Sequence, residues 1–179
     1  KAEEMFYLAQ QINSDCPMCF YNIGNSLFFR KQYKRAIWCW QKTAQIESQH
    51  PQINYRIAQA QWSLGNIDDA NEYFLTELRI DPGNIEVLTD YAVFKLQQGD
   101  LSCAKEKLNR ILELIPNYAP AYLYLGEIEL DSGNITQAEE LFEKAISLND
   151  ELIGPRFRLA QIAYEQDRTE KAIAFLKQE

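Results

Sequence analysis

The sequence contains few of the residues that build metal and catalytic sites. Its 179 residues include one histidine, His50, and four cysteines, Cys16, Cys19, Cys39 and Cys103. No acid or nucleophile can be assigned to His50, which we expect to lie in a connection between helices. No glycine-rich loop that could cradle a phosphate is present. The sequence therefore predicts no cofactor, no metal ion and no catalytic residues, and we expect that the protein is not an enzyme.

The sequence also lacks long apolar runs and a basic patch. No stretch approaches the roughly eighteen apolar residues of a transmembrane helix, and residues 1–4 show no feature of a signal peptide. The 18 Lys and Arg residues are outnumbered by 26 Asp and Glu, which gives a net charge of −8. A nucleic-acid binder would carry the opposite balance. We expect no membrane-spanning segment in this chain, no nucleic-acid partner and a cytoplasmic location; a bacterial envelope location stays open if a signal or anchor precedes residue 1.

Two of the cysteines, Cys16 and Cys19, have C-x-x-C spacing. A thioredoxin-like motif requires a preceding β-strand, and a zinc site requires a second ligand pair at a suitable spacing. Neither is present, because the upstream residues have a helical pattern and no second pair occurs. We therefore interpret all four cysteines as reduced, partly buried side chains, which favours a reducing compartment.

A period of 34 residues runs through the whole sequence without insertion. Two series of small residues follow this period, and bulky residues occur four positions after the second series. The first series is Gly24, Ala58, Ala92, Gly126 and Ala160; the second is Ala2, Ala36, Ala70, Ala104, Ala138 and Ala172; the bulky series is Phe6, Trp40, Phe74, Leu108, Phe142 and Leu176. With 46% apolar and 25% charged residues, the chain has the composition of a folded protein. The period predicts an array of similar structural units.

Each period contains the pattern of two helices. In the third unit Leu88 and Tyr91 have helical spacing, the pattern breaks around Gly99, and Ala104 and Leu108 resume it. Glycine at this break suits a left-handed helix end. Small residues let the two helices approach closely, and the bulky residue fills the space beside them. Because a single helix pair leaves an apolar face exposed, the pairs must stack into an all-α solenoid.

These features resemble the tetratricopeptide repeat (TPR) family. Residues 20–25 are similar to the first-helix signature of the family, and residues 65–70 and 133–138 are similar to its turn and second-helix start. Pro82 and Pro116 lie where the family commonly ends a repeat. The resemblance covers essentially the whole chain and implies an α-α superhelix of about five helix-turn-helix repeats.

The period also sets the predicted repeat boundaries. We expect the second helix of a truncated preceding repeat at residues 1–16, complete repeats at 17–50, 51–84, 85–118 and 119–152, and an incomplete fifth repeat at 153–179. Since array ends need polar capping helices and none is evident, we expect the sequence to be an excerpt of a longer array or protein.

The resemblance implies that the first helix of each repeat lines a concave groove that binds a peptide or helical segment of a partner protein. Aromatic rings supply contact area, and carboxamides pair with a backbone N–H and C=O together. The predicted groove residues are Tyr21, Asn22, Asn25, Phe28, Phe29, Tyr55, Gln59, Trp62, Val93, Leu96, Leu123, Glu127, Phe157, Gln161 and Tyr164. They are more aromatic toward the N-terminus and more acidic toward the C-terminus, so we expect a partner with apolar anchors and some positive charge.

Alternative functions remain open. The chain is also compatible with a substrate-recruiting arm of a larger enzyme, as in TPR-bearing glycosyltransferases, and with a self-assembling scaffold that forms homo-oligomers. A further TPR subset resembles a clamp for the C-terminal carboxylates of heat-shock chaperones. Asn25 fits that pattern, but Glu86 and Asp90 occupy clamp positions where they would repel a carboxylate, so we do not expect this activity.

Two residues depart from the family pattern. Glu77 replaces a preferred alanine, and Asn54 replaces a large apolar residue. We expect Glu77 to be exposed at the rim or paired with Arg56 or Arg79; the alternative is that the seam between the second and third repeats is loosened and can flex or admit a ligand.

Overall fold

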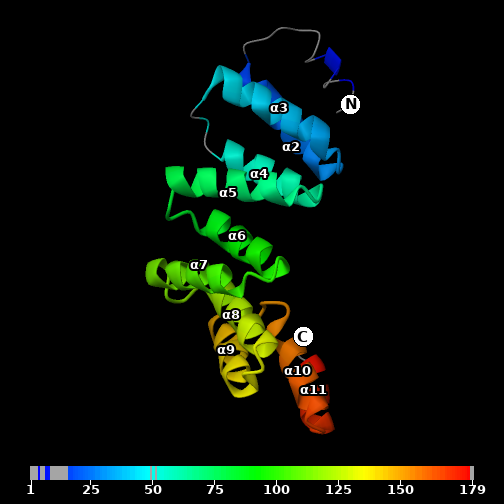
Figure 1. Ribbon diagram of the computed structural model, residues 1–179. Coiled ribbons are helices and arrows are strands. Elements are labelled where there is room, and N and C mark those ends of the chain that lie inside the picture. Colours follow the sequence, from blue (N-terminus) through cyan, green and yellow to red (C-terminus); the bar gives the residue numbers. More distant parts are fainter. Residues whose placement is uncertain (1–3, 5–6, 9–15, 49, 51, 178–179) are drawn as a thin grey trace. The chain divides into compact units, whose positions relative to one another are not determined.

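The computed structural model describes residues 4, 7–8, 16–48, 50 and 52–177, and no strand occurs among them (Figure 1). The all-α class predicted from the 34-residue period is confirmed. The chain divides into two compact units, residues 1–87 and residues 88–179. The predicted helix of a preceding repeat at residues 1–16 lies almost entirely outside the described residues.

The first unit consists of stacked helical hairpins. Its helices are α2 (Pro17–Phe29), α3 (Tyr33–Ile46), α4 (Ile53–Ser63) and α5 (Ile67–Ile80). Helix α2 packs on α3, α4 packs on α5, and α3 and α4 join the two hairpins. Helix α6 (Ile85–Gln97) begins in the first unit and continues into the second.

The second unit repeats this arrangement. Its remaining helices are α7 (Leu101–Leu114), α8 (Ala119–Asp131), α9 (Ile135–Leu148), α10 (Pro155–Glu165) and α11 (Thr169–Leu176). Helix α8 packs on α9 and α10 packs on α11, while α7–α8 and α9–α10 contacts join neighbouring hairpins. Helices α5 and α7 end directly before the predicted repeat-ending segments Asp81-Pro82 and Ile115-Pro116, since proline cannot continue a helix. Within the described residues, no helix is both long and apolar enough to cross a bilayer.

The turn inside each hairpin contains one residue in the left-handed conformation, again at intervals of 34. In three turns this residue is glycine, as predicted, with φ of 78° at Gly65, 76° at Gly99 and 80° at Gly133. The same position holds Lys31 and Asp167, each with φ of 58°. The following amide closes the turn on the preceding helix, for example from Gln32 N–H to the Leu27 carbonyl at 2.9 Å. The hydrogen-bonded turn is therefore kept even where glycine is absent.

The two small residues that are glycine in the first series lie against aromatic rings of the next helix. A Cβ added to Gly24 would lie 2.5 Å from Trp40 Nε1, and one added to Gly126 would lie 2.5 Å from Phe142 Cε1. Trp40 and Phe142 are fully buried. The predicted pairing of a small residue with a bulky partner is thus confirmed in both units. Leu176, the last member of the bulky series, is instead 53% exposed; among the described residues no helix follows α11.

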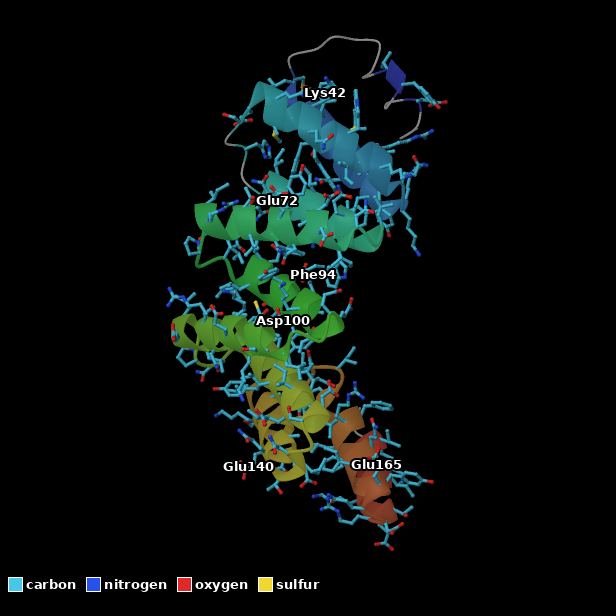
Figure 2. The ribbon with its side chains drawn as sticks, in the orientation of Figure 1. Lys42, Glu72, Phe94, Asp100, Glu140 and Glu165 are labelled. Atoms are coloured by element: carbon cyan, nitrogen blue, oxygen red, sulfur yellow. A yellow bond between two sulfur atoms is a disulfide. The ribbon has the colours of Figure 1, made fainter. Side chains whose placement is uncertain are left out.

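Charged side chains cover the outer helix faces of both units. Glu72, Glu140 and Glu165 are exposed, whereas Phe94 is fully buried (Figure 2). This separation matches the apolar periodicity of the sequence and leaves few charged groups in either interior.

Candidate functional site

A hollow of about 470 Å³ in the second unit is formed by first-helix residues of three successive repeats. Its walls come from α6, α8 and α10, together with the residue before α10. The lining residues are Leu96, Gln97, Leu123, Tyr124, Glu127, Asp131, Gly154, Phe157 and Arg158. Leucine and phenylalanine side chains give this lining an apolar surface, and two carboxylates and a guanidinium give it charged groups. The volume lies in the range of ligand-binding clefts.

Arg158 connects polar side chains at this hollow through hydrogen bonds. Its Nε donates to Glu127 Oε1 at 2.7 Å, and its Nη1 donates to Gln161 Oε1 at 3.1 Å. Gln161 Nε2 in turn donates to Glu165 Oε1 at 3.0 Å. The Arg158–Glu127 ion pair is partly exposed, so a ligand cation can compete for the carboxylate at modest cost.

Tyr124 adds a neutral hydrogen-bonding group to the wall. Burial, followed by the negative charge of Asp90, raises the pKa of the Tyr124 phenol. The phenol therefore keeps its proton at physiological pH and can donate as well as accept a hydrogen bond.

The structure brings four of the predicted groove residues together at this hollow, namely Leu96, Leu123, Glu127 and Phe157. Phe157 is 53% exposed and Tyr164 is 69% exposed. Three other predicted residues of this unit, Val93, Gln161 and Tyr164, lie on α6 and α10 but do not line the hollow.

Tyr124 and Arg158 line the hollow but were not among the predicted groove residues. They occupy the sixth position of the fourth and fifth repeats, the same register as Asn22 in the first. Asn22 was predicted as a groove residue. If the sixth position had been treated as a groove position in every repeat, as it was for Asn22, both residues would have been predicted.

In the first unit most predicted groove residues are engaged in internal contacts. Tyr55 is only 1% exposed and packs 6.3 Å from the Phe74 ring, which also contacts Trp62 at 6.2 Å. Gln59 Nε2 donates to the Tyr55 hydroxyl at 2.8 Å, and Arg56 donates to Gln59 Oε1 at 3.1 Å. These side chains form part of the packing between α4 and α5.

The aromatic residues of α2 behave similarly. The Phe28 ring lies 5.8 Å from Trp40 and 5.3 Å from Tyr33, and Asn25 Oδ1 accepts a hydrogen bond from Trp40 Nε1 at 3.2 Å. The Tyr21 ring lies 4.5 Å from His50, which occupies the connection between α3 and α4 as expected. Two predicted residues of this helix, Asn22 and Phe29, are exposed, Phe29 to 85%.

The structure corrects the prediction for Glu77. Its side chain is 4% exposed, and it forms no ion pair with Arg56 or Arg79. It lines a cavity together with Asn54 and with residues of α3. The cavity therefore lies between the first and second repeats and not at the seam between the second and third, where the alternative interpretation placed it, because Asn54 lies on α4 and faces the preceding hairpin.

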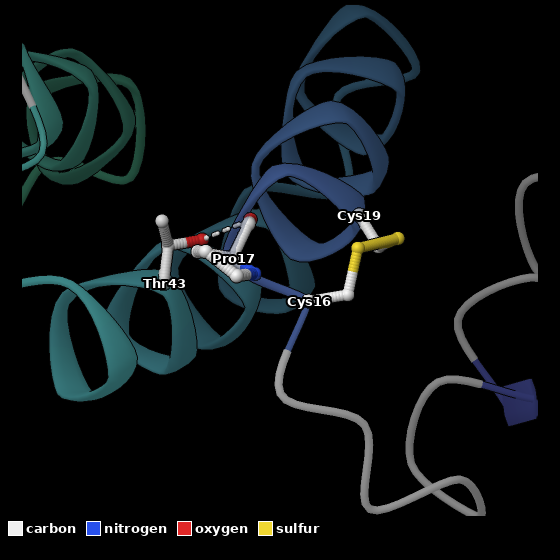
Figure 3. The surroundings of a disulfide bond; sticks show 4 residues. All are labelled: Cys16, Pro17, Cys19 and Thr43. Atoms are coloured by element: carbon white, nitrogen blue, oxygen red, sulfur yellow. Dashed lines mark hydrogen bonds between the residues drawn. A yellow bond between two sulfur atoms is a disulfide. The ribbon is translucent and has the colours of Figure 1, made fainter.

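The structure also corrects the prediction that Cys16 and Cys19 are reduced. The two residues form a disulfide at the start of α2, with Cα atoms 5.3 Å apart (Figure 3). Positions i and i+3 share one face of a helical turn, and this Cα separation lies within disulfide range, a geometry that the predicted reduced state did not take into account. Thr43 Oγ1 of α3 donates to the Pro17 carbonyl at 3.2 Å, which fixes this helix end against the hairpin.

The other two cysteines are free, as predicted. Cys39 is fully buried, and burial raises the pKa of its thiol to about 12. Burial also raises the pKa of Cys103. Both thiols are therefore packing residues with little thiolate character. In the described part of the chain, no group of three or more His, Cys, Asp or Glu side chains is placed to hold a metal ion.

Comparison with curated proteins returns relatives that match 68% to 81% of this chain. The chain is 23% identical over 147 residues to the TPR repeat-containing protein YpiA of Bacillus subtilis, covering 81% of this chain and 33% of that protein. It is 29% identical over 121 residues to sperm-associated antigen 1 of Mus musculus, covering 68% of this chain and 13% of that protein. The chain thus spans a third or less of the length of these relatives.

Solved structures share the fold. A tetratricopeptide repeat protein from Parabacteroides merdae superimposes with a TM-score of 0.82 at 18% identity, covering 98% of this chain and 70% of the other. YrrB, a TPR protein with an unusual peptide-binding site, superimposes with a TM-score of 0.68 at 17% identity, covering 99% and 91% of the two chains.

Two family models match most of the sequence. A model of the tetratricopeptide repeat matches residues 95–151 and 129–178, and a model of YpiA-like C-terminal tetratricopeptide repeats matches residues 51–118. These matches agree with the hairpins, the turn register and the paired small and bulky residues described above. The chain belongs to the tetratricopeptide repeat family.

Proposed function

We propose that this chain is a non-enzymatic scaffold that binds a peptide or helical segment of a partner protein, and that the hollow of the second unit is the anchoring site. Repeat arrays of this kind commonly present extended surfaces to other polypeptides. The observation that carries the proposal is the convergence of Leu96, Leu123 and Phe157 from three repeats on one hollow with an exposed aromatic ring.

The composition of the hollow suits a short apolar segment. Interface hot spots are typically aromatic or aliphatic anchors in a pocket with a polar rim. Here Leu123 and Phe157 would receive the anchor, while Tyr124 and Glu127 would pair with backbone or side-chain polar groups. YrrB, which has the same fold, carries a peptide-binding site by its own description, and this supports the proposed class of ligand.

The charge of the hollow favours a partner with positive charge. Glu127 and the exposed Asp131 lie on its wall with one cation, Arg158, which pairs with Glu127, and the chain as a whole carries a net charge of −8. A lysine or arginine next to the apolar anchor would gain from these carboxylates, whereas an acidic segment would be repelled. Binding should therefore weaken as the salt concentration rises.

The proposal is tested by selecting linear peptides from a display library on the immobilised chain and measuring their affinity by fluorescence polarisation. We expect selected peptides to combine an apolar anchor with Lys or Arg. Phe157→Ala and Leu123→Ala should each weaken binding about tenfold or more, as expected for anchor contacts.

Ile173→Ala is the matched control. Ile173 is 48% exposed, close to the 53% of Phe157, but it lies on the second helix of the same hairpin. Its substitution should leave peptide affinity unchanged. Peptides whose affinity falls with Ile173→Ala and not with Phe157→Ala would contradict the assignment of the groove.

A further inference from the structure

The buried polar side chains described in the two units have partners, with one exception. The Thr43 hydroxyl lies 3.2 Å from both the Pro17 and the Cys39 carbonyl oxygens and can donate to either. Glu129 accepts from Lys105 at 2.6 Å, and Arg156 donates to the Asp150 carboxylate. Glu77 is equally buried, at 4% exposure. Its carboxylate forms no hydrogen bond or ion pair with any residue that the structure describes. Burying a charge without a partner is costly, and a ligand that paired with this carboxylate would offset that cost.

Glu77 lines a cavity of about 390 Å³ inside the first unit. The cavity lies where the ends of α3 and α5 meet the start of α4. Its polar wall includes the Ser48 hydroxyl and the Asn54 carboxamide, and its apolar wall includes Ala44 and Ile80. The cavity therefore combines the unpaired Glu77 carboxylate with a hydrocarbon surface and with further polar lining residues, which are Ser48, His50, Gln52 and Asn54.

The repeat register explains why the cavity exists at this place. The residues equivalent to Glu77 in other repeats are Thr43, Ile111 and Ala145, all uncharged and fully buried. The residues equivalent to Asn54 are all larger, namely Phe20, Leu88, Tyr122 and Arg156. Asn54 thus leaves space that a larger side chain would fill, and Glu77 places a carboxylate beside that space. Two substitutions in the period converge on one cavity.

We propose that this cavity binds a guanidinium group carried on a short hydrocarbon stem. A guanidinium presents a planar fork of N–H donors that matches a carboxylate in two parallel hydrogen bonds. Glu77 would accept this pair, the Ser48 and Asn54 oxygens would accept further N–H groups, and Ala44 and Ile80 would cover the stem. The volume is sufficient for a ligand of this size. The site lies within the first unit, so the inference does not depend on the proposed groove of the second.

The direct test is titration of the full chain with agmatine, followed by isothermal calorimetry. We expect saturable binding to the wild-type chain and at least a tenfold loss of affinity in Glu77→Gln, which keeps the shape but removes the charge. Asn54→Leu should also abolish binding, because leucine fills the cavity. Glu72→Gln is the matched control, since Glu72 is exposed on the same helix (Figure 2). The affinity of this variant for agmatine should equal that of the wild type. Thermal melts of each variant establish that it is folded.

A second probe, the blocked tripeptide acetyl-Gly-Arg-Gly-amide, distinguishes the source of the guanidinium. Agmatine binding without tripeptide binding supports a free small molecule, and binding of the tripeptide supports an arginine side chain of a polypeptide. The proposal is overturned if neither probe binds, or if binding is the same in Glu77→Gln and the wild type. It is also overturned if Glu77→Leu stabilises the chain while the wild type binds neither probe, since Glu77 would then be a buried carboxylate without a ligand.

Discussion

Equivalent first-helix residues in the two units have different surroundings. Tyr55 and Phe157 occupy the same position of their repeats, yet Tyr55 is 1% exposed and Phe157 is 53% exposed. Tyr55 packs against Phe74, which is fully buried, whereas the residue equivalent to Phe74 in the fifth repeat is Leu176, itself 53% exposed. Repeat position therefore identifies a residue of the first helix, but the neighbouring helix decides whether its ring stabilises the fold or is free to bind.

The largest expected effect separates these two roles. Tyr55→Ala should lower the free energy of unfolding by about 3–5 kcal/mol, as for other large-to-small core changes. Phe157→Ala should change it by about 0.5 kcal/mol or less, as for surface positions. Urea denaturation followed by circular dichroism measures both. Equal losses in the two variants would show that the rings have the same structural role.

A smaller effect tests whether the two units pack their hairpins alike. Gly24→Ala and Gly126→Ala each place a Cβ 2.5 Å from a buried aromatic side chain, so each should destabilise the chain by about 1–3 kcal/mol through overpacking. The loss should be greater for Gly24→Ala, since displacing Trp40 also disturbs its hydrogen bond to Asn25. Thermal unfolding of both variants gives the comparison, and a neutral result for either would contradict the close approach of its helices.

The third prediction concerns Glu129 of the second unit, which is buried and has partners, unlike Glu77 of the first unit. Hydrogen bonds from Lys105 at 2.6 Å and Asn134 at 2.7 Å lower the pKa of Glu129. A lowered pKa in the folded state gives stability that is present above the unfolded-state pKa, near 4.3, and is lost as the pH falls through the folded-state pKa. Glu129→Gln should cost about 1 kcal/mol at pH 7 and reduce the loss of stability below pH 4.3. Urea midpoints measured between pH 7 and pH 3 test this; an unchanged pH dependence would contradict it.

The smallest expected effect concerns the turns. Lys31 lies in the first unit and Asp167 in the second, both in the left-handed conformation that three other turns assign to glycine. Lys31→Gly and Asp167→Gly should each stabilise the chain by up to about 1 kcal/mol, since glycine adopts this conformation without steric cost. The gain is limited by the greater freedom of glycine in the unfolded chain. Melting temperatures lower than the wild type in both variants would argue against strain at these turns.

The sequence predicted those features that depend on local spacing. The 34-residue period identified the close contact of Gly24 with Trp40 and the left-handed glycine at Gly65, Gly99 and Gly133, because small residues and turn glycines have local requirements. It did not predict the burial of Tyr55, which depends on the size of a neighbour nineteen residues away. Nor did it place Glu77 in a cavity, since that required knowing which hairpin Asn54 faces.

The disulfide shows a different limit. Spacing alone allowed Cys16 and Cys19 to be reduced, metal-bound or oxidised, and the prediction chose the reduced state. The structure shows that Cys16 precedes the first turn of α2 and Cys19 lies within it, so that the two sulfurs meet. The exact start of a helix decides this outcome, and helix ends are the least certain feature of a periodic pattern.

The most direct test of the proposed groove is a methyl NMR titration of the full chain with a selected peptide. The account predicts that the largest chemical-shift changes occur at Leu96 and Leu123, which line the hollow of the second unit. Ile57, buried in the first unit, and Ile173, on a second helix, should change little. Changes concentrated at Ile57 or Ile173, with Leu96 and Leu123 unaffected, would contradict the central claim that first-helix residues of the second unit bind the partner.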